Sequence, residues 1–240
     1  MLQTSQMTAS TWVPLSASAA AQRPRHSALV RVTHWLTALC FLALLVTGLE
    51  ILLSHPRFYW GESGNVLDTP LFKLPLPASR ASVPTGYSYV LRDQNGWSRY
   101  LHFQAAWASV LTGLLYVTYG FVTGHFRRNL LPAPAALSSQ TSYNFLQRLT
   151  YLCVIFGFFP AVIWTGLAMS PAIASVFPAT VTLLGGQQSA RTLHFFVSVL
   201  LVFFVIVHIA MVSRTGFLAR MRGMITGNSS THPSLRKDQA

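Results

Sequence analysis

Charged side chains are scarce in this chain of 240 residues, where only 9% are Asp, Glu, Lys or Arg and five are acidic. A soluble domain carries about a quarter charged residues, so this composition argues against one. Cysteines are scarce as well: Cys40 and Cys153 both lie in apolar segments, where we expect buried, unpaired thiols. They form no cluster for an iron–sulfur site, and the absence of a Cys-x-x-Cys-His motif excludes covalent attachment of haem.

Hydrophobic residues make up 52% of the chain and gather in four long segments. Apolar runs of about twenty residues are typical of membrane-spanning helices. We therefore predict an all-α fold, a four-helix transmembrane bundle within residues 26–215, with helices at about 27–53, 99–125, 143–169 and 188–213. The proline-rich stretch Ser54–Ser98 is predicted to be a long outer loop between the first two helices.

The basic residues lie at the ends of the apolar segments, although the net charge of +12 could also suggest a nucleic-acid partner. They form no patch interleaved with aromatic residues, which argues against nucleic acid. With the N-terminus inside, eleven Lys and Arg side chains fall on the inner side and six on the outer side. The positive-inside rule then predicts that both termini are cytoplasmic, in a multi-pass protein of the bacterial inner membrane, surrounded by lipid.

The two ends of the chain differ in composition from the bundle. Residues 1–25 are rich in Ser, Ala and Thr, and the first 22 hold no Lys or Arg and no compact apolar core. We expect a disordered cytoplasmic tail there rather than a signal peptide. Residues 216–240 are expected to form a basic cytoplasmic tail.

Two histidines lie on the last apolar segment, which has no charged residue from Thr192 to Ser213. His194 and His208 are fourteen residues apart, close to four helical turns, so both rings face the same way about 21 Å apart along the axis. Ionisable rings at two membrane depths are costly without partners. Two stacked haems, each taking one axial ligand from this helix, would provide those partners.

The other helices supply histidines at matching depths. His34 in the first helix is level with His208 on the inner side, and His102 in the second is level with His194 on the outer side. Each level then offers the two imidazoles that ligate a b-type haem. Alternatively, a membrane histidine can simply bond to a neighbouring helix. His26, His55, His125 and His232 are expected to be solvated, with His125 as a reserve ligand.

Three arginines each precede a proposed ligand by three residues, a spacing that places both side chains on one helix face. Arg31, Arg99 and Arg191 could each reach a haem propionate, or could be ordinary anchors at the membrane boundary.

Four short motifs, in order along residues 26–215, resemble those of bacterial di-haem cytochrome b subunits of the hydrogenase, formate dehydrogenase gamma and thiosulfate reductase type. They are His26–Trp35 with Thr47-Gly48-Leu49, the loop run His55-Pro-Arg-Phe-Tyr-Trp-Gly61, which looks most like the thiosulfate reductase type, Tyr143–Arg148 with Thr165-Gly166-Leu167, and Arg191-x-x-His194 with His208. The resemblance implies two non-covalent haems b, with His34 and His208 on the cytoplasmic haem and His102 and His194 on the outer one.

The resemblance also implies a quinone near the inner haem, close to the Asn at the start of the third helix, here Asn144. That residue could instead be a helix N-cap. The expected function is then electron transfer between the quinone pool and a periplasmic oxidoreductase, by resemblance a molybdopterin enzyme. The alternative is a haem-free membrane anchor or small transporter whose histidines relay protons.

The charge distribution gives a test of orientation. A reporter that is active only in the periplasm, fused after Ala240, should stay silent because positive loops remain in the cytoplasm. The control is a fusion ending at Asp68 in the predicted outer loop, which should be active. Activity after Ala240 would reverse the inner and outer assignments.

Overall fold

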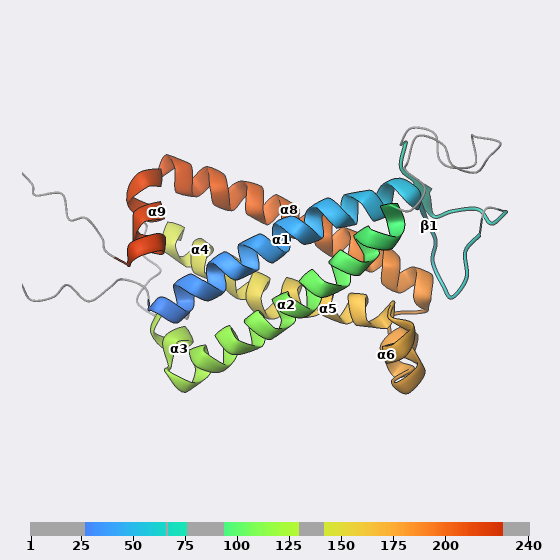
Figure 1. Cartoon of the computed structure of the whole chain (residues 1–240), viewed down its shortest axis with the longest axis horizontal. Helices are drawn as coiled ribbons and strands as arrows, with labels where there is room; N and C mark the ends of the chain where they lie inside the picture. The colour runs from blue at the N-terminus through green and yellow to red at the C-terminus, as the bar shows by residue number, and fades with distance from the viewer. Residues whose placement is uncertain (1–26, 66, 76–93, 130–141, 228–240) are drawn as a thin grey trace, which may run out of the picture.

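The computed structural model describes residues 27–65, 67–75, 94–129 and 142–227 (Figure 1). The predicted tail at residues 1–25 and the end of the basic tail, residues 228–240, lie outside the described residues. Within the described part, four helices are long and apolar enough to cross a membrane. The predicted all-α, four-span architecture is confirmed.

The first span, α1 (Ala28–Ser54), lies within one residue of its predicted bounds. Ser27 precedes it in an extended conformation, and its hydroxyl accepts a hydrogen bond from the Val30 N–H at 3.3 Å, which satisfies one donor of the first turn. The helix ends at His55, because the following Pro56 disfavours a helical backbone for the residue before it.

The second span, α2 (Gln94–Val122), begins five residues before the predicted start and ends three residues before the predicted end. Gly96 does not interrupt it, since one glycine costs a helix only about 1 kcal/mol. At its other end Gly124 has a φ of +64°, a turn that separates α2 from the short helix α3 (His125–Asn129).

The third span was predicted as one continuous helix but consists of three segments: α4 (Ser142–Cys153), the π-helical η2 (Val154–Phe158) and α5 (Phe159–Ala168). Pro160 stands in the first turn of α5. Proline lacks an N–H and clashes with the carbonyl four residues earlier, and a wider π turn accommodates that defect. Cys153, expected to be buried, is exposed on this span, while Cys40 is partly covered, and both are free thiols.

The fourth span, α8 (Gln187–Arg214), again matches its predicted bounds within one residue. Two short helices, α6 (Pro171–Val176) and α7 (Ala179–Thr182), connect it to α5. Gly186 precedes α8 with a φ of +114°, and a Cβ there would lie 2.5 Å from the backbone of Gly61. Only glycine fits this approach of the outer loop to the start of α8.

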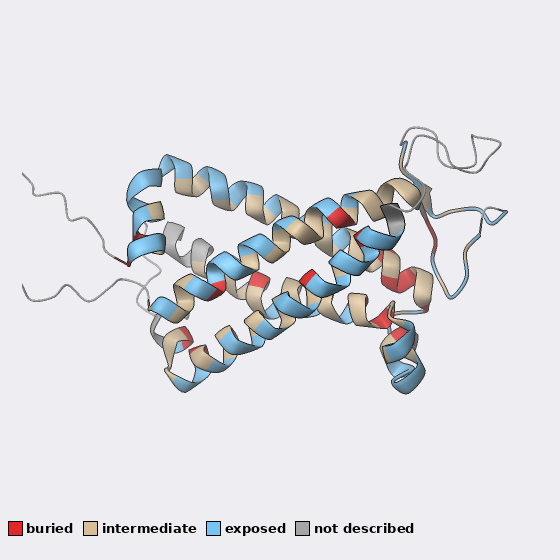
Figure 2. Cartoon of the chain, in the orientation of Figure 1, coloured by how far each residue is buried: buried red, intermediate tan, exposed pale blue. Residues whose placement is uncertain are grey.

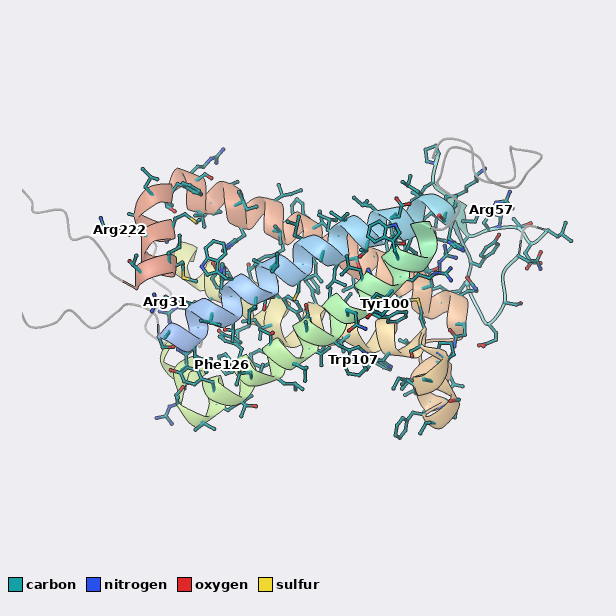
Figure 3. All side chains as sticks on the ribbon, viewed as in Figure 1. Arg31, Arg57, Tyr100, Trp107, Phe126 and Arg222 are labelled. Atoms are coloured by element: carbon teal, nitrogen blue, oxygen red, sulfur yellow. The ribbon has the colours of Figure 1, made fainter. Side chains whose placement is uncertain are left out.

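Part of the predicted basic tail forms a further helix, α9 (Phe217–Thr226), which begins after Gly216. Its last turn packs on α1: the Arg31 guanidinium donates to the carbonyl of Ile225 at 2.7 Å, and the Trp35 indole N–H donates to that of Met224 at 3.2 Å. These donors satisfy carbonyls that a helix end leaves without partners. Figure 3 shows Arg31 at this end of the bundle and Arg57 at the opposite end.

The spans group into two halves. Contacts are most extensive between α1 and α2 and between α5 and α8, and they are sparse between the two halves. The start of α1 and the end of α8 lie at one end of the bundle, while the connection from α1 to α2 lies at the other (Figure 1). This up-and-down order places His34 beside the end of α8 and His102 beside its beginning.

Much of the length of the spans is exposed or only partly buried (Figure 2), and many of the exposed residues are large and apolar. Leu39, Leu111 and Phe203 are each about two-thirds exposed, at 65%, 64% and 64%. Such a surface needs lipid around it, because water would not cover so much apolar area favourably.

The outer loop contains a small hairpin of β1 (Arg57–Phe58) and β2 (Phe72–Lys73), paired antiparallel with Phe58 opposite Phe72. The Phe58 ring packs against Phe72 and against Phe195 of α8, each at 4.6 Å between centroids. The loop was predicted, but its attachment to α8 was not.

Hydrogen bonds fix this loop to the first turns of α8. The Gly61 carbonyl accepts from the N–H groups of Gln188 and Ser189 at 3.0 and 3.2 Å, and the Ser189 hydroxyl accepts from the Gly61 N–H at 2.8 Å. The buried Thr192 hydroxyl donates to the Tyr59 carbonyl at 2.7 Å. The loop therefore provides the acceptors that the beginning of α8 needs.

Replacing Thr192 with Val should loosen the loop, because a similar shape remains while the Tyr59 carbonyl loses its donor. We expect a cost of about 1–3 kcal/mol, measured as faster protease cleavage within the outer loop and a lower Tm in detergent. Thr182→Val is the control, since Thr182 is exposed and its hydroxyl bonds only to the Ala179 carbonyl of its own helix. Unchanged protease resistance in Thr192→Val would show that this bond does not hold the loop.

Candidate functional site

The inner pair of histidines meets between α1 and α8. The ring centroids of His34 and His208 lie 6.4 Å apart, with their planes tilted by 50°. Aromatic rings surround the pair: Trp35 contacts His34, while Phe204 and Tyr151 contact His208. The sequence predicted that His34 and His208 lie at the same depth on the inner side, and in the structure these two residues are neighbours.

The outer pair meets between α2 and α8 at the same separation. The centroids of His102 and His194 lie 6.4 Å apart, and their planes are inclined by 61°. Each ring also contacts a threonine from the helix packed beside its own: Nδ1 of His102 lies 2.9 Å from Oγ1 of Thr47, and Nδ1 of His194 lies 2.9 Å from Oγ1 of Thr165.

These threonines were not predicted as site residues. Thr47 and Thr165 are buried, at 0% and 3% exposure, and each hydroxyl also donates to its own helix four residues earlier. The Thr-Gly-Leu motifs that contain them are visible in the sequence, but a threonine alone in a helix carries no sign of a partner on another helix.

Two of the three predicted arginines gather near the outer pair. Arg191 donates to the backbone carbonyl of His55 and lies over the Phe58 ring at 5.0 Å, and Arg99 lies 3.5 Å from Nε2 of His55. Two guanidinium groups thus converge on one residue at the outer end of the bundle. His55, expected to be solvated, is the third residue of this cluster.

The other two predicted site residues lie at the inner end. Arg31 bonds to the last turn of α9, and its buried Nε has no hydrogen-bond partner among the residues that the structure describes. Asn144 is in the first turn of α4, where its side chain lies outside the described part of the chain.

Of the remaining histidines, the two that the structure describes, His55 and His125, take no part in the pairs. His125 starts α3 and packs against Tyr116 and Phe126, with ring centroids 6.3 and 6.1 Å away, so it is partly buried rather than fully solvated. His26 and His232 lie outside the described residues.

Comparison with known proteins agrees with this arrangement. A family model described as prokaryotic cytochrome b561 matches residues 25–227, which include all four paired histidines. The chain is also 29% identical over 216 residues to the putative protein-methionine-sulfoxide reductase subunit YedZ1 of Azospira oryzae, with 82% of this chain and 96% of that protein covered.

These matches confirm the resemblance to bacterial cytochrome b subunits and favour the haem-based reading of the membrane histidines over a haem-free transporter. The family match and the four apolar spans together make the chain a multi-pass protein of the inner membrane. The chain belongs to the prokaryotic cytochrome b561 family.

Proposed function

We propose that the chain is a di-haem electron-transfer subunit, which connects the quinone pool at the inner side of the membrane with a redox partner at the outer side. The observation that carries this proposal is the equal separation of the two histidine pairs, 6.4 Å between ring centroids at both levels. Two histidine–histidine pairs at different depths, both with a separation that suits a shared ligand, favour a common role over incidental packing.

The separation suits a metal held between the rings. Each metal–nitrogen bond to an imidazole is about 2 Å, which puts the two nitrogens about 4 Å apart and the ring centres roughly 2 Å further. His34 with His208 would hold the inner haem, and His102 with His194 the outer one. Both pairs span the seam between the α1/α2 and α5/α8 halves, whose helices make sparse contacts with each other.

The outer arginines support the same proposal. Arg99 and Arg191 bring two positive charges to His55 just beyond the outer pair. Guanidinium groups bind carboxylates through paired, charge-assisted hydrogen bonds, so these two would neutralise the propionates of the outer haem. Arg31, at the inner end, donates instead to the Ile225 carbonyl of α9.

Haem b, when bound, accepts and releases one electron at a time. The chain fixes the route of those electrons through α8, because His194 and His208 both belong to this one helix. Their fourteen-residue spacing separates the two sites by about 21 Å along the axis. The rings of Trp35, Tyr151 and Phe204 lie beside the inner pair, in which His208 is half-buried and His34 is exposed.

The quinone would react at the inner end, near the start of α4. Asn144 lies in the first turn of that helix, and Tyr151 two turns later touches His208. An amide can donate a hydrogen bond to a quinone carbonyl. The orientation by positive charge, with both termini cytoplasmic, places this end on the cytoplasmic side.

The partner would dock at the outer loop. Trp60, Leu67 and Leu71 expose 59%, 92% and 59% of their surface there, on the loop that is fixed to α8 next to the outer pair. The curated relative is described as a subunit of a protein-methionine-sulfoxide reductase, which fits a periplasmic oxidoreductase as the partner. Resemblance favours a molybdopterin enzyme.

Removing one ligand tests the assignment. The unmodified chain should hold two haems b by pyridine haemochrome assay against protein mass, and His194→Ala and His208→Ala should each hold one, since alanine cannot ligate iron. His208→Ala should also lose reduction by quinol, whereas His194→Ala should keep its inner haem reducible.

His125→Ala is the matched control, because His125 is also a partly buried histidine of the bundle but lies outside both pairs. It should retain both haems. Two haems in either ligand variant, or loss of a haem in His125→Ala, would contradict the assignment.

A further inference from the structure

The tripeptide Thr-Gly-Leu occurs twice, at residues 47–49 in α1 and 165–167 in α5, and each copy faces one histidine of the outer pair. The helix that carries the motif is in each case the close neighbour of the helix that carries the histidine. The distance from Oγ1 to Nδ1 is 2.9 Å in both copies. The two halves of the bundle therefore hold their outer imidazoles in the same way.

Hydrogen-bond accounting assigns the direction of these contacts. A threonine hydroxyl has one proton, and Thr47 donates it to the Ala43 carbonyl at 2.7 Å, as Thr165 does to the Ala161 carbonyl at 2.9 Å. With its proton on that carbonyl, the same oxygen accepts from the imidazole. Nδ1 of each histidine then carries the proton, which leaves the lone pair on Nε2.

The glycine after each threonine determines how closely the ring can approach. A Cβ built on Gly48 would lie 3.6 Å from Cε1 of His102, and one built on Gly166 would lie 3.4 Å from Cε1 of His194. Both distances are ordinary van der Waals contacts, so each ring lies directly against the glycine of its neighbouring helix. The threonine hydroxyl thus holds the ring through Nδ1, and the glycine leaves room for the adjacent Cε1 edge of the ring.

We propose that Thr47 and Thr165 are positioning residues for the outer haem: each accepts the Nδ1 proton of its histidine and so presents Nε2 as the ligating atom. This inference rests on the proposed function. An acceptor on the distal nitrogen makes an imidazole a stronger electron donor to iron. It therefore favours ferric over ferrous haem, and its removal should raise the midpoint potential of the outer haem.

The test compares Thr47→Val and Thr165→Val, which keep the shape but remove the acceptor, with Thr47→Ser and Thr165→Ser, which keep the hydroxyl. Haem content is measured by pyridine haemochrome, and the midpoint potential of each haem by redox titration of its spectrum. The outer haem is the one that is missing from His194→Ala.

We expect both valine variants to raise the ratio of reduced to oxidised outer haem at a fixed ambient potential by roughly two- to fivefold, the scale of one neutral hydrogen bond. The serine variants should stay near the unmodified value, and the inner haem should not respond. Thr33→Val is the matched control: Thr33 is buried on α1 with the same bond to its own helix, at 2.9 Å to the Leu29 carbonyl, and should leave the outer potential unchanged.

Each outcome either supports or overturns the positioning role of the two threonines. Loss of the outer haem in a valine variant and its retention in the matching serine variant would also support the role. An unchanged outer potential in both valine variants, or equal effects of serine and valine, would overturn it. If the unmodified chain held no haem, the proposed function itself would fail, and the positioning role with it.

Discussion

An imidazole inside a membrane has to find all its partners within the protein, because the lipid around it offers neither donors nor acceptors. The outer two histidines each lie within hydrogen-bond distance of a threonine hydroxyl on the neighbouring helix. The inner two contact each other and neighbouring aromatic rings. The relative positions of α1, α2, α5 and α8 are those that bring the histidine rings together in two pairs.

The division into two halves bears on the free energy of unfolding. The α1/α2 and α5/α8 halves pack well internally and touch each other sparsely, and both histidine pairs span the seam between them. In the proposed function each haem is then bonded to both halves at once. A ligand that binds only the folded protein adds its binding free energy to the free energy of unfolding. The cofactors would thus join the halves of the protein as well as carry its electrons.

Much of this could be predicted from the sequence, since α1 and α8 are apolar runs with clear boundaries and the histidine levels follow from helical rise alone. The rest depends on contacts between distant segments. The π turn of η2 results from how Pro160 is accommodated, and α9 is recognised only when Arg31 and Trp35 are seen to bond its last turn. Similarly, the two-residue strands have no local sequence pattern, because their role depends on contact with α8. The threonine acceptors have none either, because their role depends on the histidines of the neighbouring helices.

Helix α8 carries one histidine of each pair on a single rigid segment, and this limits how its length can change. One residue inserted between His194 and His208 would rotate one ring by about 100° relative to the other and remove it from its partner. Two added turns, seven residues, would restore the facing to within about 20° but would lengthen the gap by roughly 10 Å. Between His194 and His208 the chain can therefore vary by substitution but not by small insertions or deletions. The ends of α8, near Gln187 and Arg214, are free of this constraint, because a change of length there leaves the angle between the two rings unchanged.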